Sequence, residues 1–354
     1  PNTVYKFIMP PLEGPRKDLD PKFVESVGKF VSDVKNGKIQ GTNNIALATV
    51  SLLEQIISDS QNPTAFDLCN TVRAVGQRLT AALPQELVAA NVTRRVLRAI
   101  RDENRANVNQ SADGSGASLQ RLVLAAPARR GTIGSAQNDL REPIRDQIAE
   151  LRAEIESSTS SISGQAREHV HADELILTYG ASVSAERFLR IAAPRKYRLL
   201  LAEGVDVRES HAMASRLAAA GVSVTVISNA SIFAVMSRVN KVVLSVQAAL
   251  GGGAALVPTG ALAVTQAAKH HSVPVIFPVT LVCLYNISTD KSMTIYFLVL
   301  HRRSESGSVQ TFAPLHDFAP PDHITLFITN LGGSSPSYMY RLLSELYDPK
   351  DYTL

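Results

Sequence analysis

The spacing of hydrophobic residues differs between the first and the second part of the chain. In the first part, apolar side chains recur at every third or fourth position, which places them on one face of a helix. In residues 21–34 the spacing includes Phe23, Val27 and Phe30, and Asp20 is a suitable N-cap because its carboxylate can accept a free N–H group. The same spacing predicts further helices over residues 44–58, 64–82, 91–104 and 140–155. Residues 107–118 and 127–138 are rich in Gly, Ser and Asn, which favours loops.

The second part repeats one sequence pattern, in which a short apolar strand is followed by a turn of small residues and then by a helix. The predicted strands cover residues 174–180, 197–204, 222–228, 241–246, 273–277 and 326–330. Strands that alternate with helices form parallel sheets with right-handed crossovers, because each helix returns the chain to the same end of the sheet. Residues 279–309 depart from the repeat: two apolar runs flank a polar segment there, a pattern compatible with a hairpin.

The predicted fold class is therefore α/β. Residues 1–168 form an N-terminal helical domain that would bind partners. Residues 169–354 form a Rossmann-like, three-layer α/β/α domain with a mainly parallel sheet, which would serve subunit assembly. We treat residues 279–309 as an atypical insertion between its fifth and sixth strands.

Composition excludes several classes of protein. A hydrophobic fraction of 45% and a charged fraction of 19% are typical of globular domains. The net charge of +4 is too small to argue for direct contact with nucleic acid. Cys69 and Cys283 match no metal or redox spacing and favour a reducing compartment, so we expect a cytosolic protein without metal or cofactor. We see no signal peptide and no apolar run near the roughly 18 residues that span a membrane.

Chemistry in an open parallel sheet takes place just past the carboxyl ends of the strands. Those ends carry Gly180, Gly204, Asn229 and a glycine run at 251–253. The glycine run lacks the spacing of a dinucleotide or P-loop motif, which favours a structural turn over a phosphate cradle. Glu203 is the carboxylate that follows a strand directly, but no Cys, Lys or Arg stands at a neighbouring strand end to complete an acid–base pair. The strand ends therefore look empty of catalytic groups.

Two other groups of residues invite a functional interpretation. His270 and His271 are adjacent on a helix and point about 100° apart, so they favour a polar helix end over a metal site; His169 and His171 lack a third ligand. The basic run at 94–105 has no interleaved aromatic residues, which favours a solvated face or a face for an acidic or phosphorylated partner over RNA. We take as its candidate partner surface Arg94, Arg95, Arg98 and Arg101.

Several long segments resemble the regulatory subunits of eukaryotic translation initiation factor 2B. They are AAAGVSVTVISNASIFAVMSRVNKVVLS at 218–245, AAKHHSVPVIF at 267–277 and PPDHITLFITNLGGSSPSYMYRLLSELYDP at 320–349. The N-terminal VRAVGQRLTAALPQE and NVTRRVLRAIRDE are similar to the helical domain of these proteins. IFAVMSRVNK and NLGGSSPSYMYRLLSELY resemble the beta type most. The likeness covers most of the chain, is weak over residues 107–138 and is absent over 279–309.

The resemblance implies a non-catalytic regulatory subunit of a guanine-nucleotide exchange complex. In that family the epsilon subunit exchanges GDP for GTP on translation initiation factor 2, and the phosphorylated alpha subunit of that factor inhibits the complex. It implies partnership with the alpha, gamma, delta and epsilon subunits, with beta and delta paired through their α/β domains, and contact of the helical domain with initiation factor 2. Candidate interface residues alternate along the first strands, and for the apolar ones ordinary core is an equal alternative: Asp173, Leu175, Arg198, Leu200, Thr225 and Ile227.

The family shares its fold with sugar-phosphate isomerases such as methylthioribose-1-phosphate and ribose-1,5-bisphosphate isomerases. Those enzymes have a catalytic Cys after the first strand, a catalytic Asp after the third and a phosphate-binding Arg after the second. The matching positions are Gly180, Asn229 and Val205. Because glycine cannot attack or protonate a substrate, and asparagine exchanges no proton at neutral pH, the resemblance implies a vestigial pocket at Gly180, Glu203 and Asn229. An isomerase with a relocated site, and a module that binds a sugar phosphate or nucleotide as a regulator, remain the alternatives.

Overall fold

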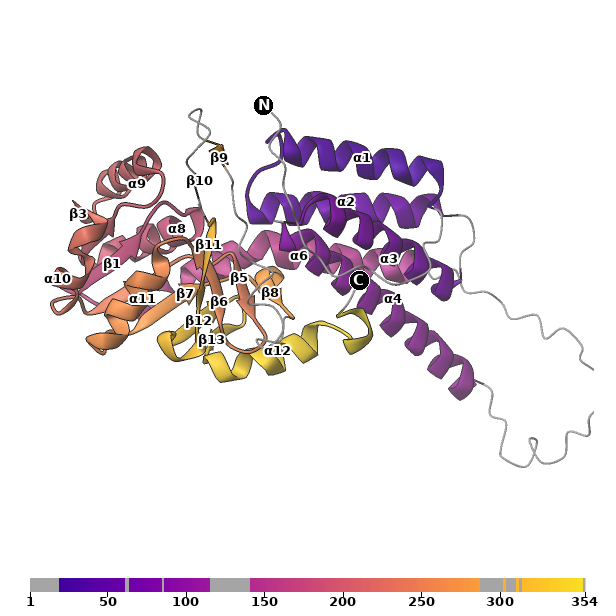
Figure 1. Cartoon of the computed structure of the whole chain (residues 1–354). Coiled ribbons are helices and arrows are strands. Elements are labelled where there is room, and N and C mark those ends of the chain that lie inside the picture. The colour runs from indigo at the N-terminus through magenta and orange to yellow at the C-terminus, as the bar shows by residue number, and fades with distance from the viewer. Residues whose placement is uncertain are drawn as a thin grey trace, which may run out of the picture. The chain divides into compact units, whose positions relative to one another are not determined.

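The computed structural model describes residues 19–60, 64–84, 86–114, 141–286, 302–303, 310–311, 314–352 and 354 (Figure 1). The chain divides into two compact units, which we call the helical unit (Arg16–Glu154 with Tyr347–Leu354) and the α/β unit, which contains Ile155–Leu346. This division differs from the predicted boundary at residue 168. Helix α6 (Arg141–Gly164) runs through the boundary without a break, and the last residues of the chain belong to the helical unit.

The helical unit is built from the amphipathic segments that the periodicity predicts. Its helices are α1 (Pro21–Lys35), α2 (Thr42–Asp59), α3 (Ala65–Ala82), α4 (Leu87–Gly114) and the first part of α6. Asp20 caps α1 as predicted, since its carboxylate accepts the N–H of Lys22 at 3.0 Å. The predicted loop at 107–118 is wrong in its first part, because α4 continues to Gly114; residues 115–118 and 127–138 lie outside the described residues.

The core of the helical unit follows from these helical faces. Each helix turns its apolar stripe inward, so residues three and four apart are buried together. The fully buried members include Leu53, Ile56, Ile57, Leu68, Val72, Val75, Leu79, Val96, Leu97, Ile100, Ile144 and Ile148. In contrast, Phe66 at the start of α3 is 72% exposed.

The α/β unit is organised around a seven-stranded sheet with the strand order β13-β12-β7-β4-β1-β2-β3. Neighbouring strands are parallel except for the pair of β12 and β13. The sheet confirms the predicted Rossmann-like fold: β1 lies between β4 and β2, and the chain winds outward from it in both directions. The strands are β1 (Leu175–Tyr179), β2 (Arg198–Ala202), β3 (Ser223–Ile227), β4 (Lys241–Val243), β7 (Val275–Pro278), β12 (Leu326–Thr329) and β13 (Gly332–Ser334).

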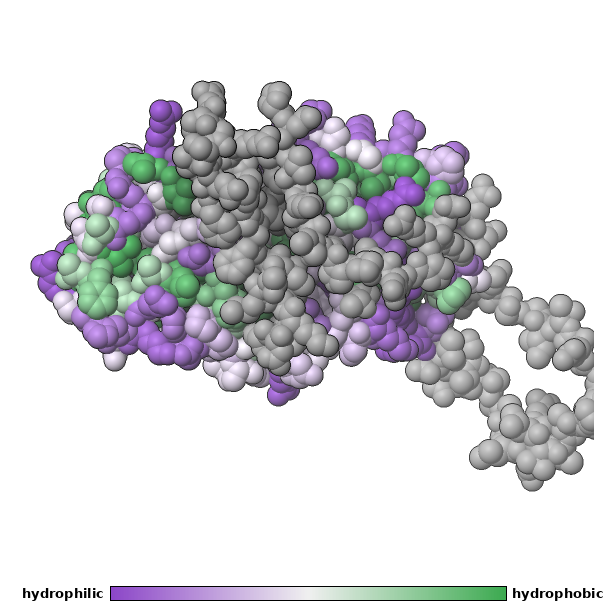
Figure 2. Space-filling view, viewed as in Figure 1, coloured by the Kyte–Doolittle hydropathy of each residue, from purple (hydrophilic) through white to green (hydrophobic). Residues whose placement is uncertain are grey.

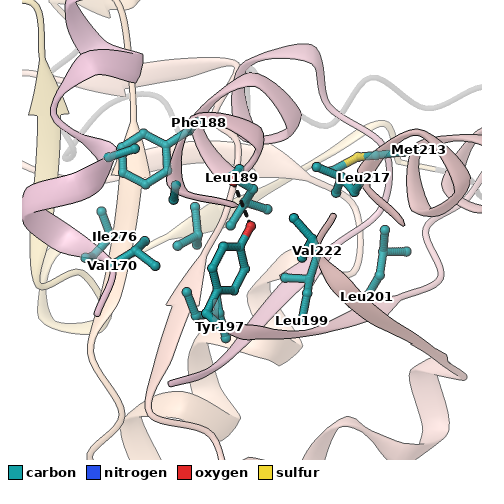
Figure 3. Close-up of a cluster of buried hydrophobic side chains, with 14 of the residues drawn as sticks. Val170, Phe188, Leu189, Tyr197, Leu199, Leu201, Met213, Leu217, Val222 and Ile276 are labelled. Atoms are coloured by element: carbon teal, nitrogen blue, oxygen red, sulfur yellow. Dashed lines mark hydrogen bonds between the residues drawn. The ribbon is translucent and has the colours of Figure 1, made fainter. Parts of the chain in front are cut away.

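Besides the last part of α6, the helices described in this unit are α7 (Ala166–His169), α8 (Val183–Ala192), α9 (Val207–Ala219), α10 (Ile232–Met236), α11 (Ala261–His270) and α12 (Met339–Leu346). Phe188 and Leu189 of α8 and Met213 of α9 pack over one face of the sheet, in a buried cluster (Figure 3). Within that cluster the Tyr197 hydroxyl donates to the Leu189 carbonyl at 2.7 Å, which satisfies its one polar atom in an apolar environment.

A second, smaller sheet with the order β11-β6-β5-β8 was not predicted. It consists of β5 (Ala248–Leu250), β6 (Ala255–Pro258), β8 (Leu284–Tyr285) and β11 (His316–Ala319). The glycine run at 251–253 is the turn between the antiparallel strands β5 and β6, so it does not open a helix as the phosphate interpretation required. Gly253 has φ +80°, and the backbone of Pro336 lies against it, which leaves no room for a side chain.

The predicted insertion at 279–309 is only partly described. Its first residues are buried and form the short 3₁₀ helix Leu281–Cys283 and strand β8, so that part belongs to the core of the unit. Strands β9 (Arg302–Arg303) and β10 (Gln310–Thr311) pair antiparallel, as in a hairpin. The other residues of the segment lie outside the described ones.

Candidate functional site

The carboxyl ends of β1 and β2 meet through two glycines. Gly180 has φ +63° and donates its N–H to the Ala202 carbonyl at 2.9 Å. A β-carbon on Gly204 would lie 2.7 Å from the α-carbon of Gly180, closer than real β-carbons approach other atoms. Gly204 in turn donates its N–H to Ser210 Oγ at 3.1 Å. Backbone atoms therefore fill the space between the ends of these two strands.

The remaining residues of the predicted vestigial pocket lie at the same edge of the sheet. Glu203 follows β2, and its carboxylate is 2.9 Å from Nε2 of His211 on α9. Asn229 follows β3 and is exposed. Because β1, β2 and β3 are adjacent and parallel, the structure brings Gly180, Glu203 and Asn229 to one edge, where the alternation of strands and helices predicted them. The side chains of Glu203 and His211 are 28% and 54% exposed, so this contact is partly open to solvent.

The N-terminus of α11 is occupied by a carboxylate of the chain itself. Asp317 Oδ2 accepts the N–H groups of Gly260, at 2.7 Å, and of Leu262, at 3.4 Å. A helix N-terminus attracts anions because its first N–H groups are unsatisfied and its dipole is positive there. Asp317 satisfies that demand, so this helix end is not free for a phosphate group. Periodicity could not indicate this residue, because it reaches α11 from the unpredicted strand β11.

The same arrangement holds the end of β1 against α11. The Tyr179 hydroxyl donates to the Thr259 carbonyl at 2.7 Å. Burial, and then the negative charge of Asp317, raise the pKa of Tyr179. Gly260 has φ +94° and lies against the Tyr179 ring, so a larger residue would displace it. This phenol is therefore a neutral structural donor at ordinary pH.

Large apolar side chains are exposed along this edge of the sheet. Val183 follows β1 and is 78% exposed, and Val205 follows β2 and is 82% exposed. We name as the apolar edge Val183, Val205, Val207 and Val226, together with Phe233 of α10, whose ring lies away from the strand ends, beside the end of α11. Figure 2 shows apolar surface over this part of the α/β unit, around α9, β3 and α10. Grouped apolar side chains on a surface indicate contact with another macromolecule more than binding of a charged metabolite.

Phe233 is the aromatic member of the apolar edge. It lies on α10 and is 56% exposed. Its ring centroid is 5.2 Å from those of His270 and His271, which end α11, and the two imidazoles contact edge to face. The histidines thus support an exposed aromatic ring. Among the described residues, no group of three or more His, Cys, Asp or Glu side chains could hold a metal ion.

Several of the predicted interface residues lie opposite one another on neighbouring strands of the sheet. Leu175 pairs with Arg198, and Leu200 pairs with Thr225 on the edge strand β3. Arg198, Thr225 and Asp173 are exposed, whereas Leu175, Leu200 and Ile227 are partly buried. Among the described residues, strand β3 has no neighbour on its outer side in the seven-stranded sheet, and of its side chains only Val224 and Ile227 are partly buried while the others are exposed. A role in a subunit interface stays a prediction for these residues.

The four arginines proposed as a basic partner surface all have partners within the chain, but only Arg94 is buried, so for the other three the role stays a prediction. Arg94 is only 4% exposed and donates to the Asp351 carbonyl at 3.0 Å, so the prediction is wrong for this residue. Arg95 makes a bidentate pair with Glu154 at 2.9 and 2.6 Å. Arg101 pairs with Asp351, and Arg98 pairs with Asp102 at 3.3 Å.

The error at Arg94 has a simple cause. Arg94, Arg98 and Arg101 recur at helical spacing on α4, and such a row looks solvated when only its own helix is considered. Arg101 pairs with Asp348 and Asp351, about 250 positions later, and Arg94 donates to the backbone carbonyls of Asp351 and Tyr352. The acidic residues near the chain's end are the signal that could have indicated the contact.

Comparison with known proteins identifies the family. The model of the initiation factor 2 subunit family matches residues 38–336. The chain belongs to this family. A translation initiation factor eIF2B subunit beta of Schizosaccharomyces pombe is 36% identical, over 93% of this chain and 97% of that protein. The subunit beta of Dictyostelium discoideum is 29% identical, over 91% of this chain and 95% of that one. These relatives confirm the resemblance and support a regulatory subunit of the eIF2B exchange factor.

Solved structures agree with this assignment. The crystal structure of eIF2B beta from Chaetomium thermophilum has a TM-score of 0.73 and 25% identity, and covers 94% of this chain and 93% of that one. A chain of the tetrameric eIF2B-beta2-delta2 complex from C. thermophilum has a TM-score of 0.72 and 26% identity, with coverages of 92% and 95%. The translation initiation factor eIF-2B of Pyrococcus horikoshii OT3, at 14% identity and a TM-score of 0.61, shares the fold, over 90% of this chain and 98% of that one.

Proposed function

We propose that this chain is a non-catalytic subunit of the eIF2B exchange factor, and that it acts through protein contacts made by the apolar edge. The observation that carries the proposal is the composition of the edge formed by the ends of β1, β2 and β3. Where an isomerase of this fold would bind and convert its substrate, this chain has two glycine backbones in contact and exposed valine side chains. Those groups supply no proton, no nucleophile and no phosphate ligand, but they suit a protein interface.

The positions matched to isomerase catalytic residues support the same conclusion. Gly180 stands for the Cys and Asn229 for the Asp, and Val205 stands for the phosphate-binding Arg. A Cys at position 180 would also need the strained φ of +63° that glycine adopts readily. Glu203 remains, but it is paired with His211 at the surface. The chain therefore carries no isomerase reaction in this proposal.

The relatives support the choice of partners. The C. thermophilum relative assembles as beta2-delta2, and eIF2B delta of the same organism has a similar fold, with a TM-score of 0.63 at 16% identity. We propose that the α/β unit pairs with a delta subunit, and that the assembled factor includes the alpha, gamma and epsilon subunits. In the cytosol the factor would exchange GDP for GTP on translation initiation factor 2, and the phosphorylated alpha subunit of that factor would inhibit it.

Phe233 is the residue on which the pairing can be tested. A half-exposed aromatic ring supported by two neighbouring rings is typical of an interface anchor. Placing a carboxylate there would bury a charge against the partner, which is unfavourable without a counter-ion. Phe66 of the helical unit offers a matched control, because it is also an exposed phenylalanine on a helix.

The experiment is co-purification of the tagged chain with its delta partner. Phe233→Asp is expected to lower the apparent affinity at least tenfold, whereas Phe66→Asp leaves it within twofold. Equal retention of delta by both variants, with unchanged melting temperatures, would contradict the role of the apolar edge. A parallel assay with methylthioribose 1-phosphate and ribose 1,5-bisphosphate should give no turnover; turnover that is lost on Asn229→Ala would restore the isomerase alternative.

A further inference from the structure

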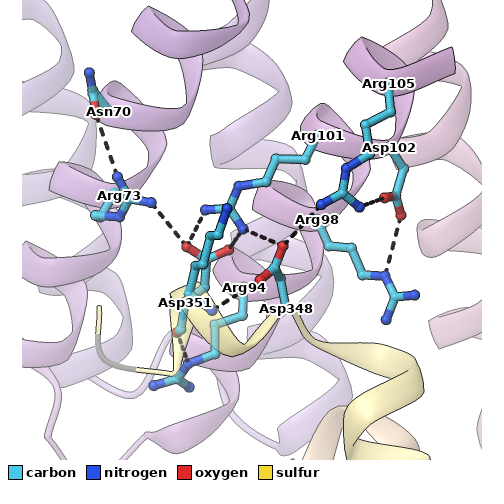
Figure 4. Close-up of polar contacts among 10 residues, drawn as sticks. Asn70, Arg73, Arg94, Arg98, Arg101, Asp102, Arg105, Asp348 and Asp351 are labelled. Atoms are coloured by element: carbon cyan, nitrogen blue, oxygen red, sulfur yellow. Dashed lines mark hydrogen bonds and ion pairs between the residues drawn. The ribbon is translucent and has the colours of Figure 1, made fainter. Parts of the chain in front are cut away.

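The end of the chain returns to the helical unit and places a carboxylate in a cage of arginines. Asp351 is completely buried. Arg73 of α3 donates to its Oδ1 at 3.0 Å, and Arg101 of α4 donates to both of its carboxylate oxygens (Figure 4). Arg94 donates to the backbone carbonyls of Asp351, at 3.0 Å, and of Tyr352, at 3.3 Å. Three cations from two helices therefore converge on one short segment.

A second carboxylate extends the same contact. Asp348 accepts the N–H of Lys350 at 3.0 Å and so caps the 3₁₀ turn Pro349–Asp351. It also lies 3.2 Å from Arg101 and 3.8 Å from Arg105 (Figure 4). The hydrogen bond from Lys350 and the charges of Arg101 and Arg105 lower the pKa of Asp348. The turn therefore presents two aspartates three positions apart to the row of arginines on α4.

Apolar contacts also hold the segment against the helical unit. Tyr347 is 1% exposed and Leu354 is 7% exposed, so both ends of the segment are buried. Leu354 lies over Gly76 of α3, where a β-carbon would stand 3.3 Å from its Cδ1 and 2.6 Å from Cγ2 of Thr93 on α4. The helical unit thus holds the segment by apolar packing as well as by ion pairs.

The distribution of charge indicates that the segment stabilises the packing of α3 against α4. Arg73, Arg94 and Arg101 converge on one position, and their polar neighbours besides the segment include Asn70 and Asn91, which are neutral. Without the two aspartates, like charges on α3 and α4 would face one another in a region of low water content, which is unfavourable. An acidic segment is therefore part of what lets these two helices pack in their observed register.

We propose that residues 347–352, together with Leu354, form a clasp, an acidic segment that closes on the arginines of α3 and α4 and locks the helical unit in its packed form. The chain passes from one unit to the other at residues 154–155 and again at 346–347. The clasp is thus the segment with which the chain, after the α/β unit, packs again into the helical unit. Its opening would loosen α3 and α4 and leave the sheet of the α/β unit intact.

The two cysteines of the chain provide a built-in measurement. Cys69 lies on α3 beside the clasp and is 8% exposed; burial raises its pKa, while Arg101 and Arg73 lower it. Cys283 is 6% exposed and belongs to the α/β unit. A buried thiol reacts only when its surroundings open, so the alkylation rates of the two cysteines report separately on the two units.

The experiment is pulsed alkylation of the full chain with N-ethylmaleimide, followed by peptide mass spectrometry. Asp351→Asn keeps the shape of the side chain and removes its charge, and it is expected to raise the alkylation rate of Cys69 at least tenfold while that of Cys283 stays within twofold. Asp322→Asn is the matched control: it removes a carboxylate that pairs with Lys269 at the surface of the α/β unit and should change neither rate. Should Asp351→Asn not fold, Arg73→Gln, which removes a cage arginine that is 30% exposed, should raise the Cys69 rate by a smaller factor. An unchanged Cys69 rate, or a parallel rise of both rates, would overturn the proposal.

Discussion

Gly180 and Gly204 contact each other through their backbones, at the ends of the adjacent strands β1 and β2. A β-carbon on Gly204 would stand 2.7 Å from the Gly180 α-carbon, and Gly180 itself has φ +63°. The contact closes the point at which an enzyme of this fold would place its chemistry. It also makes both positions sensitive to substitution in a measurable way.

We expect Gly204→Ala to lower the free energy of unfolding of the α/β unit by about 1–3 kcal/mol, the usual cost of overpacking a rigid core. The added methyl group would meet backbone atoms, which cannot move aside as a side chain can. Gly164→Ala is the control within the same unit, because a β-carbon there has no atom within 4 Å. Urea unfolding of both variants should give a loss for the first and none for the second; equal stability would show that the strand ends separate without cost.

In the helical unit, Gly76→Ala is expected to destabilise the packing of α3 on α4. Its β-carbon would stand 2.6 Å from the Thr93 methyl group, on a β-branched side chain with little freedom to turn. We expect a loss of about 1–3 kcal/mol. Gly28→Ala in α1 meets nothing within 4 Å and should gain about 0.5–1 kcal/mol from helix propensity. Thermal unfolding followed by circular dichroism tests the opposite signs of the two substitutions.

Asp317 is predicted to stabilise the start of α11 by its charge and by its hydrogen bonds. Asp317→Asn keeps one acceptor oxygen but loses the charge that favours a helix N-terminus, worth about 0.3–1 kcal/mol. Asp317→Ala also leaves the Gly260 N–H without this acceptor and should cost about 0.5–2 kcal/mol. Melting temperatures should therefore fall in the order wild type, Asn variant, Ala variant. An Ala variant as stable as the wild type would mean that the carboxylate does not cap the helix.

Tyr197 makes stability depend on alkaline pH. Burial raises its pKa above the value near 10 of an unfolded tyrosine, so the neutral, hydrogen-bonded phenol favours the folded state. This contribution is complete below about pH 10 and is lost as pH rises above it, because the unfolded chain releases the proton first. Tyr197→Phe should lose about 0.5–1.5 kcal/mol at neutral pH, for the missing hydrogen bond.

Measurement of unfolding free energy between pH 8 and 11 tests the sign of this effect. The variant should lose less stability than the wild type over the alkaline range, since it has no phenol to ionise at this position. Parallel curves for the two proteins would contradict the link between the buried hydroxyl and alkaline stability.

Much of the candidate site could be predicted, because it follows from the alternation of strands and helices along the chain. Consecutive parallel strands bring their carboxyl ends to one edge, so Gly180, Glu203 and Asn229 could be placed together before the structure was known. The residues that contact this edge from other parts of the chain could not be predicted. Asp317 contacts Gly260 from 57 positions away, on a sheet whose strands of two to four residues have too few positions to reveal a period.

The sequence by itself determined most of the helices, the succession of the long strands along the chain and the family, since periodicity and motifs are local properties of the chain. Only the tertiary structure decided which charges are solvated. Arg73 and Asp351 are 278 positions apart, and the burial of Arg94 depends on a segment that the rest of the chain must first bring back to α4. Whether an arginine is a surface group or part of a core is set by the partner that reaches it, and the helical spacing of α4 carries no information about that partner.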